Sequence, residues 1–216
     1  MLFSNTVKSR RAALRSEWDI RREFETLEES CVPSYAHKNP LAAWTAWSRL
    51  TAAARLYERF APEGPVLDFG SATGELRQVL QPRGDYHFVE QNDVLVKGLQ
   101  RNFPDAKRVD GEDLGQGRFA AVFALDSLEH NEEIGPILSA IARSLRPDGV
   151  FILSGPTENV LYRLGRRLAG FDGHYHVQTI YDIERQAGAE FQRVARSLQP
   201  AGVPLFALSA WRARGA

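Results

Sequence analysis

From residue 65 onward, short apolar runs alternate with amphipathic segments, and this alternation restricts the fold more than any other feature. The expected strands are residues 65–69, 86–90, 107–109, 119–125 and 150–155, and the expected helices are residues 74–81, 93–103 and 132–146. Apolar strands separated by amphipathic helices are typical of a parallel sheet that is covered on both faces. Two further strand-like runs, residues 190–198 and 204–213, predict an antiparallel hairpin. The expected fold class is therefore α/β, with a doubly wound, mostly parallel sheet.

Two helices are expected before the first strand. Residues 7–30 are charged and carry apolar side chains at helical spacing, namely Ile20, Phe24, Leu27 and Cys31. The second helix spans residues 40–60, where Asn39 can act as the N-cap and Pro40 suits the first helical position. Its expected apolar stripe is Trp44, Trp47, Thr51, Ala54 and Tyr57. Because "APEGP" ends this helix, we expect a helical lid segment over residues 1–61 and the main domain over residues 62–216.

The composition excludes several classes of protein. The 216 residues include 27 Lys plus Arg and 27 Asp plus Glu, so the formal net charge is zero. The chain lacks the positive charge that would favour nucleic acid as its partner. Cys31 is the single cysteine, which excludes a disulfide framework and a cysteine-based metal cluster. Neither a membrane-spanning apolar run nor the apolar core of a signal peptide is found, so a cytoplasmic location is expected.

The stretch "VLDFGSATGEL" (66–76) combines an apolar strand with a turn of small residues, Gly70-Ser71-Ala72-Thr73-Gly74. In doubly wound sheets, ligands bind beyond the carboxyl ends of the strands, near the first strand. Small residues allow a ligand to touch the main chain there. Glu90 ends the second strand, 20 residues after Gly70. A carboxylate at this place accepts hydrogen bonds from a ribose diol and disfavours a 2′-phosphate.

A nicotinamide dinucleotide is one candidate ligand, but the glycine spacing disfavours it. Its fingerprint is G-x-G-x-x-G, whereas this chain has Gly70-x-Ala72-x-Gly74, with Glu75 where the third glycine would stand. Asp68, just before the turn, would repel a pyrophosphate but could hold an amine. A ligand with a ribose and an amine but without a phosphate fits better, and S-adenosylmethionine has those features.

The ordered motifs resemble those of class I S-adenosylmethionine-dependent methyltransferases. They are "LDFGSATGEL" at the first strand, "VEQND" at the second, "VDGEDL" after the third, "ALDSLEH" at the fourth and "SLRPDGVFILSGP" at the fifth, over residues 65–156. The family usually has glycine at the position of Ala72. The resemblance is strongest to the small-molecule branch that includes the ubiquinone-pathway O-methyltransferases. It implies a Rossmann-like seven-stranded sheet and S-adenosylmethionine as the cofactor.

By position, the resemblance also implies roles for individual residues. Asp68 and Gly70 would bind the methionine part, Glu90 the ribose, and Asp110 with Gly111 the adenine. Leu125 and Asp126 would line the methionine side, and Arg49 would bind the cofactor's carboxylate, as an N-terminal arginine does in this branch. The full cofactor-binding set is Arg49, Asp68, Gly70, Ser71, Ala72, Gly74, Glu90, Gln91, Asp110, Gly111, Leu125 and Asp126.

The acceptor is less well defined by the sequence. The tetrapeptide typical of N-methylation, Asn/Asp-Pro-Pro-aromatic, is replaced by "LDSL" (125–128), which favours oxygen, or carbon, over nitrogen as the acceptor. His130, His174 and His176 are the candidate bases or acceptor-binding groups, although each could instead be a solvent-facing or capping residue. Their spacing matches no recognised metal-ligand motif, so no metal is predicted.

Two alternatives remain open from the sequence. Residues 158–171 combine an apolar stripe of Val160, Leu161, Leu164 and Leu168 with Arg163, Arg166 and Arg167. We favour a helix that packs on its own sheet, but the same pattern is typical of contact with an anionic membrane, in which case the acceptor would be lipid-linked. The second alternative is a non-catalytic scaffold or partner protein that keeps the fold. Against it, the carboxylates of Asp68, Glu90 and Asp110 are all present.

Overall fold

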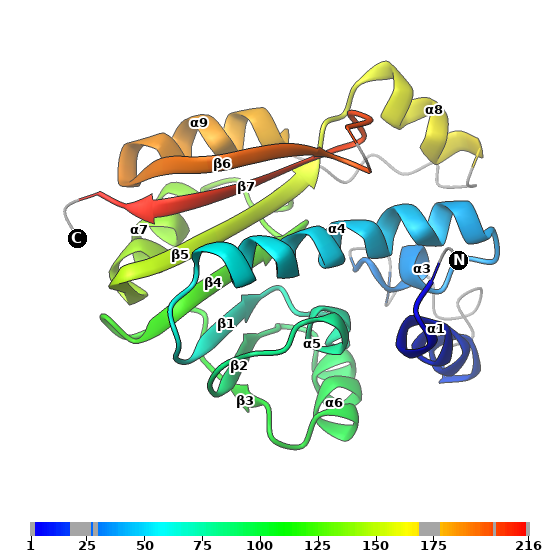
Figure 1. The fold of residues 1–216 in the computed structure, drawn as a ribbon, viewed down its shortest axis with the longest axis horizontal. Helices are drawn as coiled ribbons and strands as arrows, with labels where there is room; N and C mark the ends of the chain where they lie inside the picture. The colour runs from blue at the N-terminus through cyan, green and yellow to red at the C-terminus, as the bar shows by residue number, and fades with distance from the viewer. Residues whose placement is uncertain (1–2, 18–26, 28–29, 169–177, 201, 215–216) are drawn as a thin grey trace.

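A computed structural model of the chain describes residues 3–17, 27, 30–168, 178–200 and 202–214. Its centre is a seven-stranded sheet with strand order β3-β2-β1-β4-β5-β7-β6 (Figure 1). The strands are β1 (Val66–Phe69), β2 (Tyr86–Val89), β3 (Lys107–Arg108), β4 (Phe119–Leu125), β5 (Leu145–Pro156), β6 (Phe191–Gln199) and β7 (Phe206–Ala213). The first five strands pair in parallel, and β7 pairs antiparallel to both β5 and β6. The predicted fold class, including the C-terminal hairpin, is confirmed.

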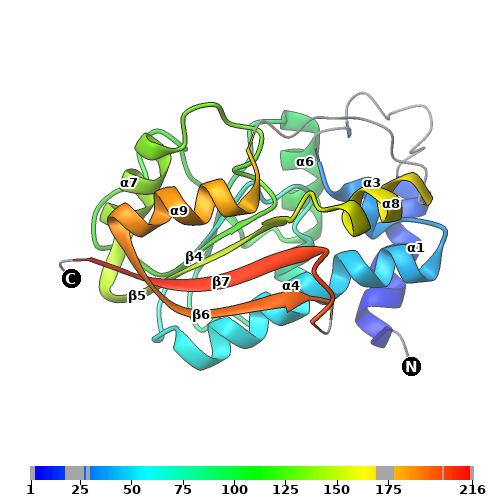
Figure 2. The ribbon, with the colours of Figure 1, turned by 90° about the horizontal axis from the view of Figure 1, so that it is seen from above.

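Helices cover both faces of this sheet. The described helices are α1 (Asn5–Glu17), α3 (Val32–Tyr35), α4 (Pro40–Phe60), α5 (Glu75–Val79), α6 (Asp93–Asn102), α7 (Gly135–Ser144), α8 (Val160–Leu168) and α9 (Ile180–Glu190). Figure 2 shows α7 and α9 on one side of the sheet and α4 on the opposite side. The helices α1, α3, α5 and α6 share the apolar cluster of α4. The direction of chain winding reverses between β1 and β4, so the carboxyl ends of these strands form the switch point.

Strand β4 explains why the core has two halves. All seven of its residues are buried, and successive side chains point to opposite faces of the sheet. Ala121 and Phe123 join the cluster beneath α4, whereas Val122 and Ala124 join the cluster beneath α7 and α9. A strand buried on both faces must be apolar throughout, which is why residues 119–125 have no polar alternation.

Helix α4 begins as its sequence predicts. The side chain of Asn39 accepts a hydrogen bond from the backbone N–H of Leu41, and Pro40 occupies the first helical turn. The predicted stripe is partly wrong, because Thr51 is exposed. The buried face instead includes Trp47, Leu50 and small residues that allow the helix to approach the sheet closely, such as Ala43, Ala46, Ala53 and Ala54.

Other element boundaries differ from expectation. In the expected helix over residues 7–30, α1 ends at Glu17, and Leu27 is helical and fully buried. Ile20 and Phe24 lie outside the described residues. Cys31 does not continue that helix but is the N-cap of α3. Helix α9 was not expected, although Thr179 and Asp182 form a capping box at its start.

Helix α8 does not pack on the sheet along its predicted apolar stripe. Val160 is 81% exposed, Leu164 is 53% exposed and Leu161 is 45% exposed. The favoured reading, in which this stripe covers the chain's own sheet, is therefore wrong for these three residues. Tyr162 of this helix makes an edge-to-face contact with Phe206 of the hairpin.

The loop between β1 and α5 turns through left-handed backbone at alternate residues. The φ angles are 80° at Gly70, 47° at Ala72 and 86° at Gly74. An added Cβ on Gly70 would lie 2.3 Å from the Cβ of Ser127, so this glycine also permits close contact with the segment after β4. The loop is fixed to the neighbouring strand because the backbone N–H groups of Gly70 and Ser71 both donate to the carbonyl of Val89.

We predict that Gly70→Ala destabilises the protein more than Gly117→Ala does. Both glycines have positive φ, but an added Cβ on Gly117 meets nothing within 4 Å. Gly117→Ala should therefore cost the backbone strain alone, about 1–2 kcal/mol, whereas Gly70→Ala should cost roughly 1–3 kcal/mol more because of the steric overlap. Urea unfolding of the two variants measures the difference. Equal losses would show that the loop does not press against Ser127.

Candidate active site

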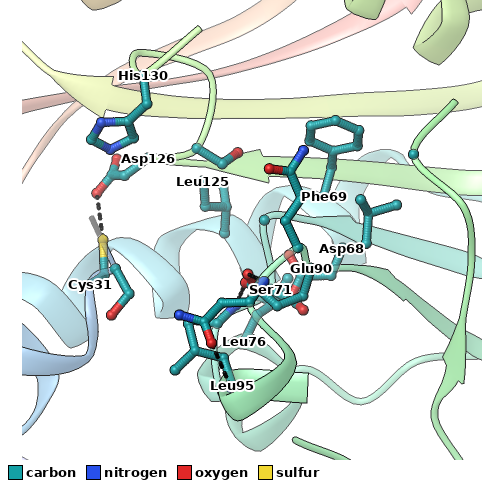
Figure 3. Close-up of a pocket in the computed structure, with 18 of the residues that line it drawn as sticks. Cys31, Asp68, Phe69, Ser71, Leu76, Glu90, Leu95, Leu125, Asp126 and His130 are labelled. Atoms are coloured by element: carbon teal, nitrogen blue, oxygen red, sulfur yellow. Dashed lines mark hydrogen bonds between the residues drawn. The ribbon is translucent and has the colours of Figure 1, made fainter. Parts of the chain in front are cut away.

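The carboxyl ends of β1, β2 and β4 border a cavity of about 1140 Å³. Ten of the twelve predicted cofactor-binding residues line it: Asp68, Gly70, Ser71, Ala72, Glu90, Gln91, Asp110, Gly111, Leu125 and Asp126. Gly74 and Arg49 do not line it. Figure 3 shows that Glu90, Ser71 and Asp68 lie toward one end of the cavity, and that Cys31, Asp126 and His130 lie toward the other.

Asp68 ends the buried part of β1 and is only 3% exposed. Its Oδ2 accepts a hydrogen bond of 2.5 Å from the hydroxyl of Tyr86, on the adjacent strand β2. Burial raises the pKa of Asp68 to about 7; the Tyr86 hydrogen bond opposes this rise, and the charges of Glu75 and Glu90 add to it. A cation bound near Asp68 would favour its ionised form.

Glu90 connects the end of β2 to the glycine-containing loop. Its Oε2 accepts from the backbone N–H of Ala72 at 2.9 Å, and its Oε1 accepts from the backbone N–H of Asn92 at 3.0 Å. Burial raises the pKa of Glu90, although these backbone hydrogen bonds favour the charged form. Because each carboxylate oxygen has two lone pairs, Glu90 can still accept hydrogen bonds from a ligand diol.

The loop after β3 forms the outer wall of the same end. Asp110 is exposed, and its Oδ1 accepts from the backbone N–H of Glu112 at 3.0 Å. A Cβ added to Gly111 would lie 3.2 Å from Cγ1 of Val89, so the loop runs close to β2. Gln91 and Gly111 also line the cavity here.

At the opposite end, Cys31 and Asp126 line the cavity, and both contact polar side chains behind them. The guanidinium of Arg49 pairs with the carboxylate of Asp126, and both side chains are 4% exposed. Cys31 Sγ lies 3.9 Å from Nη2 of Arg49 and 3.8 Å from Oδ2 of Asp126. The hydroxyl of Ser154 donates to Oδ1 of Asp126 at 3.0 Å, and Asp126 itself has a φ of 55°. The expected role of Arg49 at the cofactor's carboxylate stays a prediction.

The candidate bases lie in different parts of the chain. His130 lines the cavity, whereas His174 and His176 lie outside the described residues. The sequence does not predict that the carboxyl group of Glu129 is buried. It is 1% exposed, and burial raises its pKa to about 7. Its position next to His130 after β4 was the available signal. Within the described ranges, no group of three His, Cys, Asp or Glu side chains is arranged to hold a metal ion.

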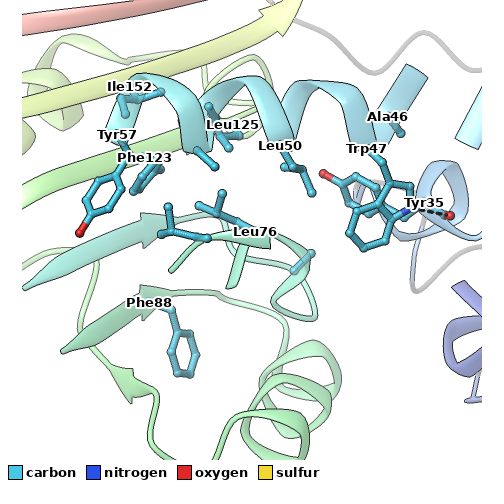
Figure 4. Close-up of a cluster of buried hydrophobic side chains, with 14 of the residues drawn as sticks. Tyr35, Ala46, Trp47, Leu50, Tyr57, Leu76, Phe88, Phe123, Leu125 and Ile152 are labelled. Carbon is cyan, nitrogen blue, oxygen red and sulfur yellow. Dashed lines mark hydrogen bonds between the residues drawn. The ribbon is translucent and has the colours of Figure 1, made fainter. Parts of the chain in front are cut away.

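The N-terminal segment supplies part of the cavity wall. Tyr35, Cys31 and Leu50 line the cavity. Trp47 does not; it is 2% exposed, its Nε1 donates to the carbonyl of Tyr35, and the two rings are 5.3 Å apart (Figure 4). Trp47 is therefore a core residue that positions Tyr35.

Comparison with known proteins identifies the family. A family model described as "Methyltransferase domain" matches residues 35–206, which is most of the chain, so the chain belongs to this family. The chain is therefore assigned to the methyltransferases as an enzyme. Comparison with curated proteins found no match.

Solved structures share the fold at low sequence identity. PH0226 protein from Pyrococcus horikoshii OT3 is 18% identical with a TM-score of 0.65, over 84% of this chain and 96% of that one. Magnesium protoporphyrin IX methyltransferase from Synechocystis PCC 6803, with bound SAH, is 19% identical with a TM-score of 0.59, over 78% and 84%. A Burkholderia thailandensis N1-methyltransferase, solved with 1,6-didemethyltoxoflavin and S-adenosylhomocysteine, is 19% identical with a TM-score of 0.58, over 89% of each chain.

We predict that Asp68→Asn stabilises the unliganded protein at pH 8 but less at pH 5. The folded-state pKa of about 7 lies above the ordinary value, so the stability due to protonated Asp68 is present at low pH and is lost as the pH rises toward 7. The gain in the free energy of unfolding should be roughly 2–3 kcal/mol larger at pH 8 than at pH 5. Urea unfolding at both pH values measures it. Tyr86→Phe removes the hydrogen bond that opposes the rise in the pKa of Asp68. In this variant, the loss of stability with rising pH should therefore extend to a higher pH than in the parent. A gain that is independent of pH would contradict the assignment.

Proposed function

We propose that the chain transfers a methyl group from S-adenosylmethionine to an oxygen atom of a small molecule or lipid-like acceptor. The observation that carries the proposal is the two-ended cavity, with carboxylates at one end and a buried polar group beside His130 at the other. S-adenosylmethionine supplies a methyl group on a sulfonium, which is already a good leaving group. The protein's main task is then to align the acceptor and exclude water, and alignment contributes on the order of 7–11 kcal/mol.

The residues at the loop end fit this cofactor. Glu90 would accept hydrogen bonds from the ribose hydroxyls, and Gly70 with Asp68 would hold the methionine amine. Ser71 Oγ is buried without a hydrogen-bond partner among the described residues, which leaves it available to a ligand. Asp110, Gly111 and Gln91 would border the adenine. The position of Ala72, where the family has glycine, lies within the same loop.

Oxygen is the proposed acceptor because "LDSL" stands at the end of β4 in place of the N-methylation tetrapeptide. Bound S-adenosylmethionine would supply the methyl carbon and release its sulfur as a thioether, and His130 would take the proton of the acceptor hydroxyl. A carbon or nitrogen acceptor is the alternative. His174 and His176 as acceptor-binding residues, and membership of the branch with ubiquinone-pathway O-methyltransferases, stay predictions.

The segment of residues 1–61 is proposed as a lid over the cofactor. Support comes from Tyr35, Cys31 and Leu50, which line the cavity from this segment. Burial raises the pKa of Cys31, so its thiol is neutral and adds no charge to this wall of the cavity. A lid of this kind excludes water from the reacting atoms, which strengthens the electrostatic interactions inside the cavity.

We predict that His130→Ala lowers the turnover rate by about a hundredfold or more while leaving the affinity for S-adenosylhomocysteine unchanged. The assay measures methyl transfer from labelled S-adenosylmethionine to a panel of small phenols, and calorimetry measures the affinity. A double His174→Ala, His176→Ala variant is tested beside it. Unchanged turnover in His130→Ala would contradict its role as the base.

We also propose that α8 contacts an anionic membrane surface, which would bring a lipid-linked acceptor to the cavity. The support is the exposure of Val160, Leu161 and Leu164 together with the basic residues of 158–171. After Glu158 the segment through residue 171 contains three arginines and no carboxylate. Apolar side chains beside cations are the pattern of a helix that lies on anionic lipid. No helix in the described ranges is long and apolar enough to span a bilayer.

Flotation with vesicles tests this contact. We expect the protein to float with phosphatidylglycerol vesicles at low salt but not with phosphatidylcholine vesicles, because the attraction is partly electrostatic. A double Val160→Asp, Leu164→Asp variant should lose flotation. Val194→Asp, which changes a 41% exposed valine on β6, should keep it. If the parent does not float at low salt, the membrane proposal is wrong.

A further inference from the structure

Glu75 is a buried carboxylate on the wall of the cavity, and the motif resemblance did not place it among the cofactor-binding residues. It directly follows Gly74, is the first residue of α5 and is 2% exposed. Its side chain lines the cavity together with Asp68 and Glu90. A buried ionised group is costly unless it is paired and hydrogen-bonded, so the partners of each of its two oxygens matter.

One oxygen of Glu75 is fully occupied by the protein. Oε1 accepts from Nη2 of Arg10 at 2.8 Å, from Nε of Arg10 at 3.1 Å and from the hydroxyl of Thr73 at 2.6 Å. The other oxygen, Oε2, is buried and has no hydrogen-bond partner among the described residues. A buried carboxylate oxygen without a hydrogen-bond donor destabilises the folded protein, because its lost hydration is not replaced. A ligand in the cavity that donates a hydrogen bond to Oε2 would remove this cost.

The surroundings of Oε2 select a cation as that ligand group. Asp68 and Glu90 line the same cavity, and their carboxylates add negative charge around Glu75. The nearest cation that the structure pairs with Glu75 is Arg10, which is bound to Oε1. A donor with a positive charge would satisfy Oε2 and also reduce the repulsion among the three carboxylates.

Arg10 connects α1 to this carboxylate across 65 residues of sequence. It is 6% exposed, and its Nη2 also donates to the carbonyl of Thr73 at 3.3 Å. Two hydrogen bonds from one guanidinium to Oε1 fix the rotation of the carboxylate, and the geometry leaves Oε2 unoccupied. Arg10 therefore acts through Glu75 rather than on a ligand directly.

We infer that Glu75 binds the amino group of the cofactor's methionine moiety through Oε2, beside Asp68 and Gly70 on the same cavity, and that Arg10 is the residue that positions Glu75. An ammonium has three N–H donors, so it can reach all three acceptors. The inference rests on S-adenosylmethionine being the cofactor. It makes α1 a structural part of the cofactor site, so that the amino-acid end of the cofactor is recognised by a carboxylate held from the N-terminal segment.

Calorimetry with two ligands tests the role of Glu75. S-adenosylhomocysteine carries the amino-acid end, whereas 5′-methylthioadenosine has the same adenosine and thioether without it. Glu75→Gln should weaken S-adenosylhomocysteine at least about tenfold, the effect of losing a hydrogen bond to a charged group, and should change the affinity for 5′-methylthioadenosine less than about threefold. Equal loss for both ligands, or no loss for either, would overturn the inference. If the parent binds neither ligand, the proposed cofactor itself is wrong.

A double-mutant cycle tests Arg10, with Arg11 as the matched control. Arg11 is a buried arginine on the same helix, but its partners are different. It donates a hydrogen bond to the carbonyl of His37, and its guanidinium lies over the ring of Phe3. Arg10→Met should weaken S-adenosylhomocysteine selectively and should add nothing in the Glu75→Gln background. Arg11→Met should leave the ratio of the two ligand affinities unchanged. If the two variants weaken S-adenosylhomocysteine binding independently, so that their fold-losses in affinity multiply in the double variant, Arg10 does not act through Glu75.

Discussion

The left-handed turns at residues 70, 72 and 74 determine how close the chain's backbone comes to the strands around it. Gly70 lies against Ser127 after β4, and the backbone N–H groups of Gly70 and Ser71 donate to the carbonyl of Val89 on β2. The loop therefore bridges the two strands that flank β1. Asp68, Glu75 and Glu90 reach one cavity because this loop brings the ends of their elements together.

Concentrating carboxylates in one cavity has an electrostatic cost, and the N-terminal segment offsets part of it. Arg10 of α1 pairs with Glu75 at one end, and Arg49 of α4 pairs with Asp126 at the other. All four side chains are nearly buried, so removing either arginine would leave an unpaired carboxylate in a region of low dielectric. The N-terminal helices are thus joined to the sheet by charge pairing at the site as well as by apolar packing.

The sheet and most of the cavity could be predicted because their signals are local. Apolar runs such as residues 119–125 indicate buried strands, and Asn39 with Pro40 marks the start of α4. The small residues at 70–74 are likewise a local signal, because they indicate a loop whose backbone a ligand can touch. Helix α9 also has a local signal, the capping box that Thr179 and Asp182 form at its start.

The charge pairs could not be predicted because they join residues far apart in the sequence. Nothing local to Arg49 indicates that its partner is Asp126, and nothing local to Arg10 indicates Glu75. The burial of Glu129 depends likewise on how distant segments pack, although its proximity to His130 was a clue. The exposure of Val160 shows that an amphipathic pattern alone does not reveal what covers the apolar face.

The central claim is that this cavity takes an adenosyl amino-acid cofactor through Glu90 at its ribose end. Calorimetry of the parent and of Glu90→Ala with S-adenosylhomocysteine, with NAD as the competing class of ligand, tests it most directly. We expect the parent to bind S-adenosylhomocysteine and not NAD. The folded Glu90→Ala variant should bind S-adenosylhomocysteine at least about tenfold more weakly, a loss of about 1.4 kcal/mol. Binding of NAD by the parent, or undiminished affinity in the variant, would contradict it.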